Sequence, residues 1–252
     1  MLAFEARAPL EAMLGVASAP LLARAPKGDG HPVLVIPPFG AADHFTAGLR
    51  IFLRTRGYEV HGWGHSDTIG LQALLGAAVE RVREVRELAA GKQVSLVGHN
   101  VGGTYAREVA RYTPHDVRCV VTLGCPSSNP KANHMWPMLE AAAGAQATMS
   151  EEFVQNMATA PPVPTTSIYS RGDGVVSWRS CIDPSPGQVE NVEVPASHCG
   201  LPFNPWALFV VADRLAQPEG NWEPFKRKGL RSILFSRGPT SRGAADADVK
   251  LP

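Results

Sequence analysis

The amino-acid sequence predicts an α/β fold in which helices cover both faces of a mostly parallel central sheet. Short apolar runs, rich in β-branched residues and bounded by glycine or proline, alternate with longer segments of helical periodicity. Strands that alternate with helices in this way pair in parallel. The length of 252 residues, of which 44% are hydrophobic, suits one domain with a full core.

Six apolar runs are expected to form buried strands, because each is too short for a helix and ends at turn residues. Four longer segments show helical patterns. The expected strands are 32–36, 58–62, 94–97, 117–123, 165–169 and 189–194, and the expected helices are 44–56, 70–90, 102–112 and 204–216. Ligands of such sheets bind at the carboxyl ends of the strands, so functional residues are expected in the loops there.

The α/β domain is expected to span residues 31–225. Residues 1–30 contain Glu5 and Glu11 within an apolar stretch and no basic lead, which favours an amphipathic helix over a secretory signal. No apolar run reaches the roughly 18 residues needed to span a bilayer, and a cytoplasmic location is expected. Residues 226–252 are basic and then rich in Gly, Ala and Asp, which predicts a flexible tail. Binding of a membrane surface or a partner through its apolar residues is the alternative.

Residues 127–163 interrupt the alternation with a helical pattern that ends in a proline-rich joint, and they are expected to form a small helical lid insertion. Its apolar side chains could form the underside of a lid over a pocket, or they could be ordinary core contacts of two helices. These side chains are Met135, Trp136, Met138, Leu139, Phe153 and Met157.

Charge and motif content exclude several classes of function. A net charge of +1 and a charged fraction of 19% do not favour nucleic-acid binding. The eight histidines show no HExxH or other zinc spacing, and the glycines of 98–103 lack the spacing of a nucleotide-binding loop. Neither a metal nor a cofactor is therefore expected. The four cysteines lack paired CxxC spacing and are expected to be buried or semi-buried thiols, with a Cys181–Cys199 bridge as the alternative.

The sequence GHNVG at 98–102 follows an apolar strand and precedes a helical pattern. Glycines on both sides of a central residue permit the tight turn of a nucleophile elbow, which exposes the central side chain. The central residue here is Asn100, where an enzyme of this layout carries serine.

Two further residues follow strands in the order that such a site requires. Asp173 lies in the loop after 165–169, and His198 lies in the loop after 189–194. An acid and a histidine so placed can hydrogen-bond, and the acid then fixes the tautomer that leaves the second ring nitrogen free to accept a proton. Singly, Asp173 is equally well explained as a turn former and His198 as a loop residue. Together with the elbow they predict the geometry of a catalytic triad.

The loop after the first strand, PPFG at 37–40, is the expected place of a backbone N–H that stabilises an oxyanion. Proline has no N–H, so the candidate donors are Phe39 and Val101, the residue after Asn100. A plain turn at the sheet edge is the alternative for this loop. Aromatic and apolar residues on the same side of the sheet predict a pocket for an apolar acyl or aromatic ligand. These residues are Phe39, Trp63, His99, Met135, Trp136 and Phe203.

Over roughly residues 30–225 the chain resembles bacterial α/β-hydrolases of the esterase and lipase group. The resemblance rests on PPFGAADHFTAGLRIFLRTRGYEVHGWG, VSLVGHNVGGTYAREVAR, VVTLGCPSSN, PTTSIYSRGDGVVSWRSC and ENVEVPASHCGLPFNPWALFVVADRLAQPEGNWEPF. It implies the α/β-hydrolase fold, hydrolysis of carboxylic esters, a serine at position 100, and Asp173 and His198 as the other members of a triad. The chain departs from the family at position 100.

Asn100 cannot act as a serine does, because its nitrogen lone pair is delocalised and neither polar atom yields an anion near neutral pH. Three interpretations follow. Asparagine replaces a natural serine and inactivates the enzyme. Alternatively, asparagine is native, and Asp173 and His198 act together as a general base on water or on a substrate proton. In the third interpretation the protein is a non-catalytic binding module on a hydrolase scaffold.

Overall fold

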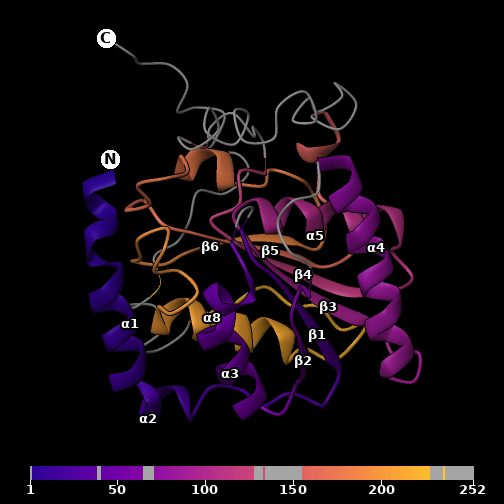
Figure 1. The fold of residues 1–252 in the computed structure, drawn as a ribbon, viewed down its shortest axis with the longest axis horizontal. Helices are drawn as coiled ribbons and strands as arrows, with labels where there is room; N and C mark the ends of the chain where they lie inside the picture. The colour runs from indigo at the N-terminus through magenta and orange to yellow at the C-terminus, as the bar shows by residue number, and fades with distance from the viewer. Residues whose placement is uncertain are drawn as a thin grey trace.

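Six strands form one central sheet in this computed structural model, which describes residues 2–38, 41–64, 71–127, 133, 155–227 and 235 (Figure 1). The strands are β1 (Pro32–Ile36), β2 (Glu59–His61), β3 (Val94–His99), β4 (Val117–Leu123), β5 (Thr165–Tyr169) and β6 (Val189–Glu193). Their order across the sheet is β2-β1-β3-β4-β5-β6, and each neighbouring pair is parallel. Each expected run forms a strand, although β3 continues two residues beyond the expected end.

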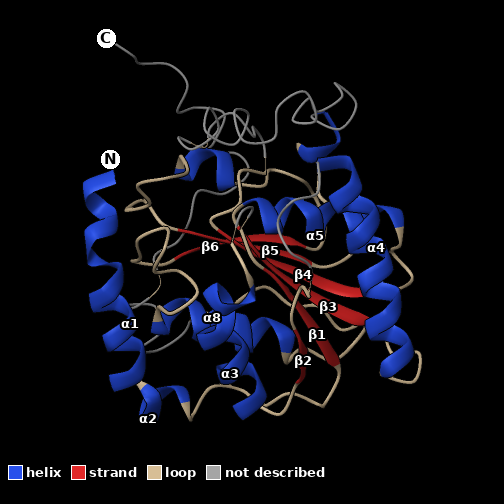
Figure 2. Ribbon diagram, in the orientation of Figure 1, coloured by secondary structure: helices blue, strands red, loops and turns tan. Residues whose placement is uncertain are grey.

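Helices cover both faces of the sheet, which confirms the predicted fold class (Figure 2). The helices are α1 (Ala8–Ala17), α2 (Ala19–Leu22), α3 (Ala47–Thr55), α4 (Leu71–Leu88), α5 (Val101–Tyr112) and α8 (Pro205–Leu215). Residues of α2, α3 and α8 pack on one face of the sheet, and residues of α4 and α5 pack on the other.

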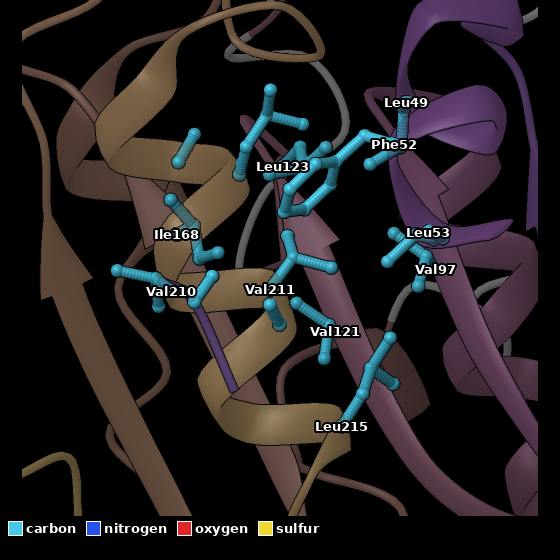
Figure 3. Packing of buried hydrophobic residues seen from close by; sticks show 14 of the residues in the cluster. Leu49, Phe52, Leu53, Val97, Val121, Leu123, Ile168, Val210, Val211 and Leu215 are labelled. Atoms are coloured by element: carbon cyan, nitrogen blue, oxygen red, sulfur yellow. The ribbon is translucent and has the colours of Figure 1, made fainter. Parts of the chain in front are cut away.

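The core under α3 and α8 is made of apolar side chains, most of them aliphatic, from these helices and from the sheet (Figure 3). Leu53 of α3, Val97 of β3 and Val211 of α8 have no exposed surface. Truncation of one such leucine to alanine typically costs about 2–5 kcal/mol, because it removes buried surface and leaves a cavity. This packing holds the carboxyl ends of the strands in fixed positions.

The start of α8 is fixed by a cap that also fixes the loop before it. Asn204 Oδ1 accepts hydrogen bonds from the N–H groups of Trp206 and Ala207 at 3.0 and 3.3 Å, and Pro205 occupies the first turn. The Nδ2 atom of Asn204 donates to the carbonyl of Pro195 at 2.9 Å. The loop that contains His198 is therefore tied at both ends by one side chain.

The N-terminal helix α1 buries its polar side chain and exposes apolar ones, which is the opposite of an ordinary surface helix. Its carboxylate residue Glu11 is 7% exposed, whereas Met13 and Val16 are 70% and 78% exposed. The expected helix forms, but the polar side chain points inward and apolar side chains point outward. Within the described residues, none of the helices is both long and apolar enough to cross a bilayer.

Most of the predicted lid insertion and of the predicted tail lies outside the described residues. Within the lid range, Met157 is almost completely buried, with 1% exposed surface. Within the tail range, Phe235 is buried and packs edge-on against Phe225, with ring centroids 4.9 Å apart. The boundaries of both segments stay predictions.

All four cysteines have free thiols, so the alternative of a Cys181–Cys199 bridge is wrong. Cys181 is buried in a cluster with Tyr169 and Val176. Cys199 lies beside the carboxylate of Glu5, and burial together with this charge raises the pKa of its thiol to about 11. The two thiols thus belong to different surroundings.

Candidate active site

A tight turn joins β3 to α5 and has Asn100 at its apex. Asn100 has φ 54° and ψ −125°, a strained conformation for a residue other than glycine. A side-chain carbon at Gly98 would collide with the start of α5, and one at Gly102 would collide with the carbonyl of Ile36 at the end of β1. The two glycines are therefore what allows the chain to turn so closely at this point.

Asp173 and His198, from the loops after β5 and β6, are joined by a hydrogen bond. Asp173 Oδ2 lies 2.7 Å from His198 Nδ1, and the two side chains are 1% and 3% exposed. The other carboxylate oxygen of Asp173 accepts the N–H groups of Val175 and Val176 at 2.8 and 2.7 Å, which fixes its orientation. Because a carboxylate accepts, Nδ1 carries the proton and Nε2 of His198 keeps its lone pair.

The carboxamide of Asn100 is held between two buried partners. Its Nδ2 atom donates to His198 Nε2 at 2.8 Å, and its Oδ1 atom accepts from Asn133 Nδ2 at 3.1 Å. Asn100 is 8% exposed and Asn133 is 1% exposed. A continuous line of hydrogen bonds thus runs from Asn133 through Asn100 and His198 to Asp173.

A second histidine, His99, packs against His198 with ring centroids 4.8 Å apart. His99 Nε2 donates to the backbone carbonyl of His198 at 3.0 Å, and Phe45 stacks on the His99 ring at 5.6 Å. Burial lowers the pKa of His99 well below its ordinary value, and the neighbouring His198 lowers it further. Its Nδ1 atom has no hydrogen-bond partner among the described residues. His99 is therefore a neutral aromatic wall beside His198.

The remaining predicted site residues lie in different surroundings. Val101 is the first residue of α5 and is buried directly after Asn100. Trp63 is buried in the core cluster of α4 and α5, and Phe203 packs edge-on against Phe45 at 6.3 Å. Three predicted residues lie outside the described part of the chain: Phe39, Met135 and Trp136.

A cavity of about 500 Å³ lies between α1, α2, α3 and α8. Phe203 lines it and contacts Phe45, which in turn stacks on His99. Neither Asn100 nor His198 belongs to its lining. This cavity is thus a neighbour of the candidate site rather than the site itself.

Several residues at the site were missed by the sequence analysis. Asn133 carries no signal of its own within the helical pattern of residues 127–163, so only the tertiary structure brings it to Asn100. Glu5 accepts the N–H of His198 at 3.0 Å, and Glu11 accepts the N–H of Ser197 at 2.8 Å. A signal for these two acids exists in the sequence, because carboxylates within an apolar helix need polar partners once they are buried.

The arrangement is chemically able to accept a proton. His198 has a fixed tautomer, and its Nε2 atom is the acceptor nitrogen, to which the carboxamide N–H of Asn100 donates at 2.8 Å. In the part of the chain that the structure describes, no group of three or more His, Cys, Asp or Glu side chains could hold a metal ion.

The parallel sheet, with the turn at Asn100 and the loops of Asp173 and His198 at the ends of its strands, defines the α/β-hydrolase fold. Solved structures of that fold agree with this class. The chain is similar to lipase B of Aspergillus fumigatus, with a TM-score of 0.62 and 17% identity over 81% of this chain and 56% of the lipase. It thus spans little more than half of the lipase's length.

Two smaller proteins match over most of their own length. An alpha/beta hydrolase enzyme from a sediment metagenome of the lagoon of Mar Chica, Morocco, has a TM-score of 0.54 and 15% identity over 74% of this chain and 90% of its own. Est1E from Butyrivibrio proteoclasticus, solved with ferulic acid bound, has a TM-score of 0.54 and 12% identity over 76% of this chain and 88% of its own. No protein-family model matches the chain, and no curated protein matches it significantly. At these identities the comparisons establish the fold.

Proposed function

We propose that the protein hydrolyses small carboxylic esters with an apolar acyl or aromatic part, without forming a covalent acyl-enzyme. In this proposal His198 is the general base that activates a water molecule, Asp173 orients its ring, and Asn100 positions the reacting groups. The observation that carries the proposal is the intact Asp173–His198 hydrogen bond, which leaves Nε2 of His198 as the acceptor nitrogen of the ring. Asn100 Nδ2 donates to this nitrogen at 2.8 Å, and in the proposal the reacting water takes the place of that donor.

The cost of burying this pair supports a chemical role. A carboxylate and an imidazole that are 1% and 3% exposed lose their hydration, and a hydrophobic pair would fill the same space without that loss. The backbone N–H of Val101, at the positive end of α5, is a candidate donor to a developing oxyanion, with Phe39 as the second candidate. Phe45 and Phe203 offer aromatic surface beside His99 for the ligand. The lipase and the ferulic-acid complex among the similar structures agree with an ester or aromatic acid as ligand.

The carboxamide of Asn100 excludes the acyl-enzyme route at this position. Its nitrogen lone pair is delocalised into the carbonyl, so His198 cannot turn it into a nucleophile by removing a proton. Both of its polar atoms are also engaged, one with His198 and one with Asn133. Water activated by His198 is the nucleophile that the remaining groups support.

A non-catalytic binding module is the second candidate, and one observation favours it. The line of hydrogen bonds from Asn133 to Asp173 is complete without any water or substrate at Nε2 of His198. A ligand could then bind against the aromatic side chains and leave this line intact.

The deciding experiment measures hydrolysis of chromogenic short-chain and aromatic esters by the unaltered chain and by His198→Ala. We expect turnover by the unaltered chain that a serine-directed phosphonate does not inhibit, and its loss in His198→Ala. His115→Ala is the matched control, because His115 is an exposed histidine in the turn before β4, whereas Asn100 follows the opposite, carboxyl end of the parallel strand β3.

Absence of turnover in every variant, combined with a rise in melting temperature when the ester is added, would favour the binding module. At a ligand concentration of 100 times Kd, binding stabilises the folded state by about 2.7 kcal/mol. Inhibition of the unaltered chain by the phosphonate would contradict the noncovalent route.

A further inference from the structure

Three charged side chains of the N-terminal segment bind the two loops that hold Asp173 and His198. These side chains are Glu5, Arg7 and Glu11, and we refer to them as the N-terminal clamp. Glu5 and Arg7 precede α1, and Glu11 lies within it. In the hydrogen bonds described below they bind backbone groups of the two loops, and Arg7 and Glu11 also form an ion pair with each other.

Glu5 bridges the two loops with a single carboxylate. One oxygen accepts the N–H groups of Gly174 and His198 at 2.8 and 3.0 Å, and the other accepts the N–H of Cys199 at 2.8 Å. Burial alone would raise the pKa of Glu5, but the N–H groups of Cys199, His198 and Gly174 outweigh it, and the pKa lies below its ordinary value. The carboxylate is therefore charged at neutral pH and holds the residues next to Asp173 and at His198 together.

Arg7 joins the same two loops through their carbonyl groups. Its Nη2 atom donates to Gly172 at 3.0 Å and to Ala196 at 2.6 Å. Gly172 and Gly174 flank Asp173, so the clamp contacts the acid loop on both sides of the carboxylate residue. A side-chain carbon at Gly172 would collide with the guanidinium of Arg7.

Glu11 completes the set from the next turn of the segment. Both of its oxygens lie within hydrogen-bond distance of the N–H of Ser197, at 2.8 and 3.1 Å, and it pairs with Arg7 at 3.0 Å. A side-chain carbon at Gly200 would collide with its carboxylate. Consecutive backbone groups on both sides of His198 are thus bound by one short segment.

We propose that Glu5, Arg7 and Glu11 are positioning residues, which fix the backbone of the His198 loop relative to the Asp173 loop and so set the hydrogen bond between the two side chains. Loops at the ends of strands are where a fold opens most readily. A displacement of about 1 Å between reacting groups costs on the order of 10²-fold in rate. The Asp173–His198 bond of 2.7 Å depends on two such loops, and the N-terminal clamp bonds to both.

The test uses the full chain and proton NMR of the hydrogen-bonded His198 ring. The Nδ1–H proton shared with Asp173 is expected at low field, and His198→Ala identifies its signal. We expect Glu5→Gln to broaden or remove this signal, because glutamine has one acceptor oxygen for three N–H groups. The hydrogen-exchange rates of the His198 and Cys199 amides are expected to rise about tenfold or more, because Glu5→Gln leaves these N–H groups without their acceptor.

Glu223→Gln is the matched control, because Glu223 is an exposed carboxylate that pairs with Lys226 and should leave the signal unchanged. If Glu5→Gln fails to fold, Arg7→Met is tested instead. This variant is expected to disturb folding less, because the Arg7 side chain is 41% exposed and methionine keeps its apolar stem. An unchanged signal and unchanged exchange rates in the folded variant would overturn the proposal. Equal acceleration of exchange at Val97 in the core would also overturn it, because the clamp would then be a general stabiliser.

This inference relies on the proposed function only for its effect on rate. If the unaltered chain or Asn100→Ser hydrolyses an ester, Glu5→Gln is expected to lower kcat by about 10- to 100-fold with KM nearly unchanged, because the clamp positions the base and not the substrate. A perturbed His198 signal without turnover in any variant would sustain the clamp and reject the hydrolytic function. Turnover together with an unperturbed His198 signal in Glu5→Gln would sustain the hydrolytic function and reject the clamp.

Discussion

Replacement of Asn100 by serine is expected to give this site acyl-enzyme chemistry, because the base and its orienting acid are already in place. The present distance from the amide nitrogen of Asn100 to His198 Nε2 is 2.8 Å. A serine hydroxyl is one bond shorter, so without movement of the turn its oxygen would lie about 1.3 Å further from the ring. The variant therefore tests both the chemistry and the reach of the site.

The expected gain follows from these distances. A complete triad nucleophile contributes about 10⁶-fold in turnover, equivalent to about 8 kcal/mol. A misplacement near 1 Å forfeits about 10²-fold of it. We therefore expect Asn100→Ser to raise ester turnover about 10⁴-fold, which corresponds to about 5 kcal/mol of transition-state stabilisation.

The assay is release of a chromogenic alcohol from a short-chain ester, with phosphonate labelling as a second readout. Asn100→Ser should be labelled at residue 100, and the unaltered chain should not. Addition of His198→Ala should remove the gain. A gain below tenfold in a variant with unchanged melting temperature, or a gain that survives without His198, would refute the reasoning from geometry.

Three further predictions concern stability, and each is checked by denaturant melts. Arg107→Met is expected to lower the free energy of unfolding by about 3–5 kcal/mol, because it leaves Asp183 charged and buried; the two side chains are 2% and 0% exposed. The double variant Arg107→Met, Asp183→Leu should recover part of this loss, and a double variant as unstable as Arg107→Met would contradict this reason. Gly102→Ala is expected to cost about 1–3 kcal/mol through collision with the end of β1, whereas Gly76→Ala, in open space on α4, should add about 1 kcal/mol. The stability that Glu5 adds is complete above its ordinary pKa of 4.5 and is lost as pH falls through its lower folded pKa. The difference in unfolding free energy between the unaltered chain and Glu5→Gln should therefore shrink below pH 4.5. A difference that grew below pH 4.5 would contradict the lowered pKa of Glu5.

The strands could be predicted almost to the residue because local patterns determine them. The run 117–123, for example, is apolar, β-branched and bounded by turn residues, and β4 has those bounds. The apolar pattern predicts the end of β3 two residues too early, because Gly98 and His99 are not typical strand residues. They pair with β4 because the turn at Asn100 begins only after them.

The candidate site could be predicted in part, for a related reason. Asn100, Asp173 and His198 each follow a strand of a parallel sheet, and such positions converge at one edge. Helical periodicity does not tell which face of an apolar helix is buried, so the only signal for the inward orientation of Glu11 is that it is a carboxylate within an apolar stretch. Asn133 could not be predicted, since its contact with Asn100 spans 33 residues and depends on the path of an insertion.

The N-terminal clamp has a consequence for the order in which the protein folds during synthesis. Its hydrogen bonds join residues that lie between 165 and 194 positions apart in the chain. Residues 5–11 leave the ribosome before their partners at 172–199, which emerge only after β1 to β5 have been made. Contacts of such high sequence separation form late, because they require the closure of the longest loop. The loops of Asp173 and His198 are therefore expected to be fixed in one of the last steps of folding, after the sheet that carries them.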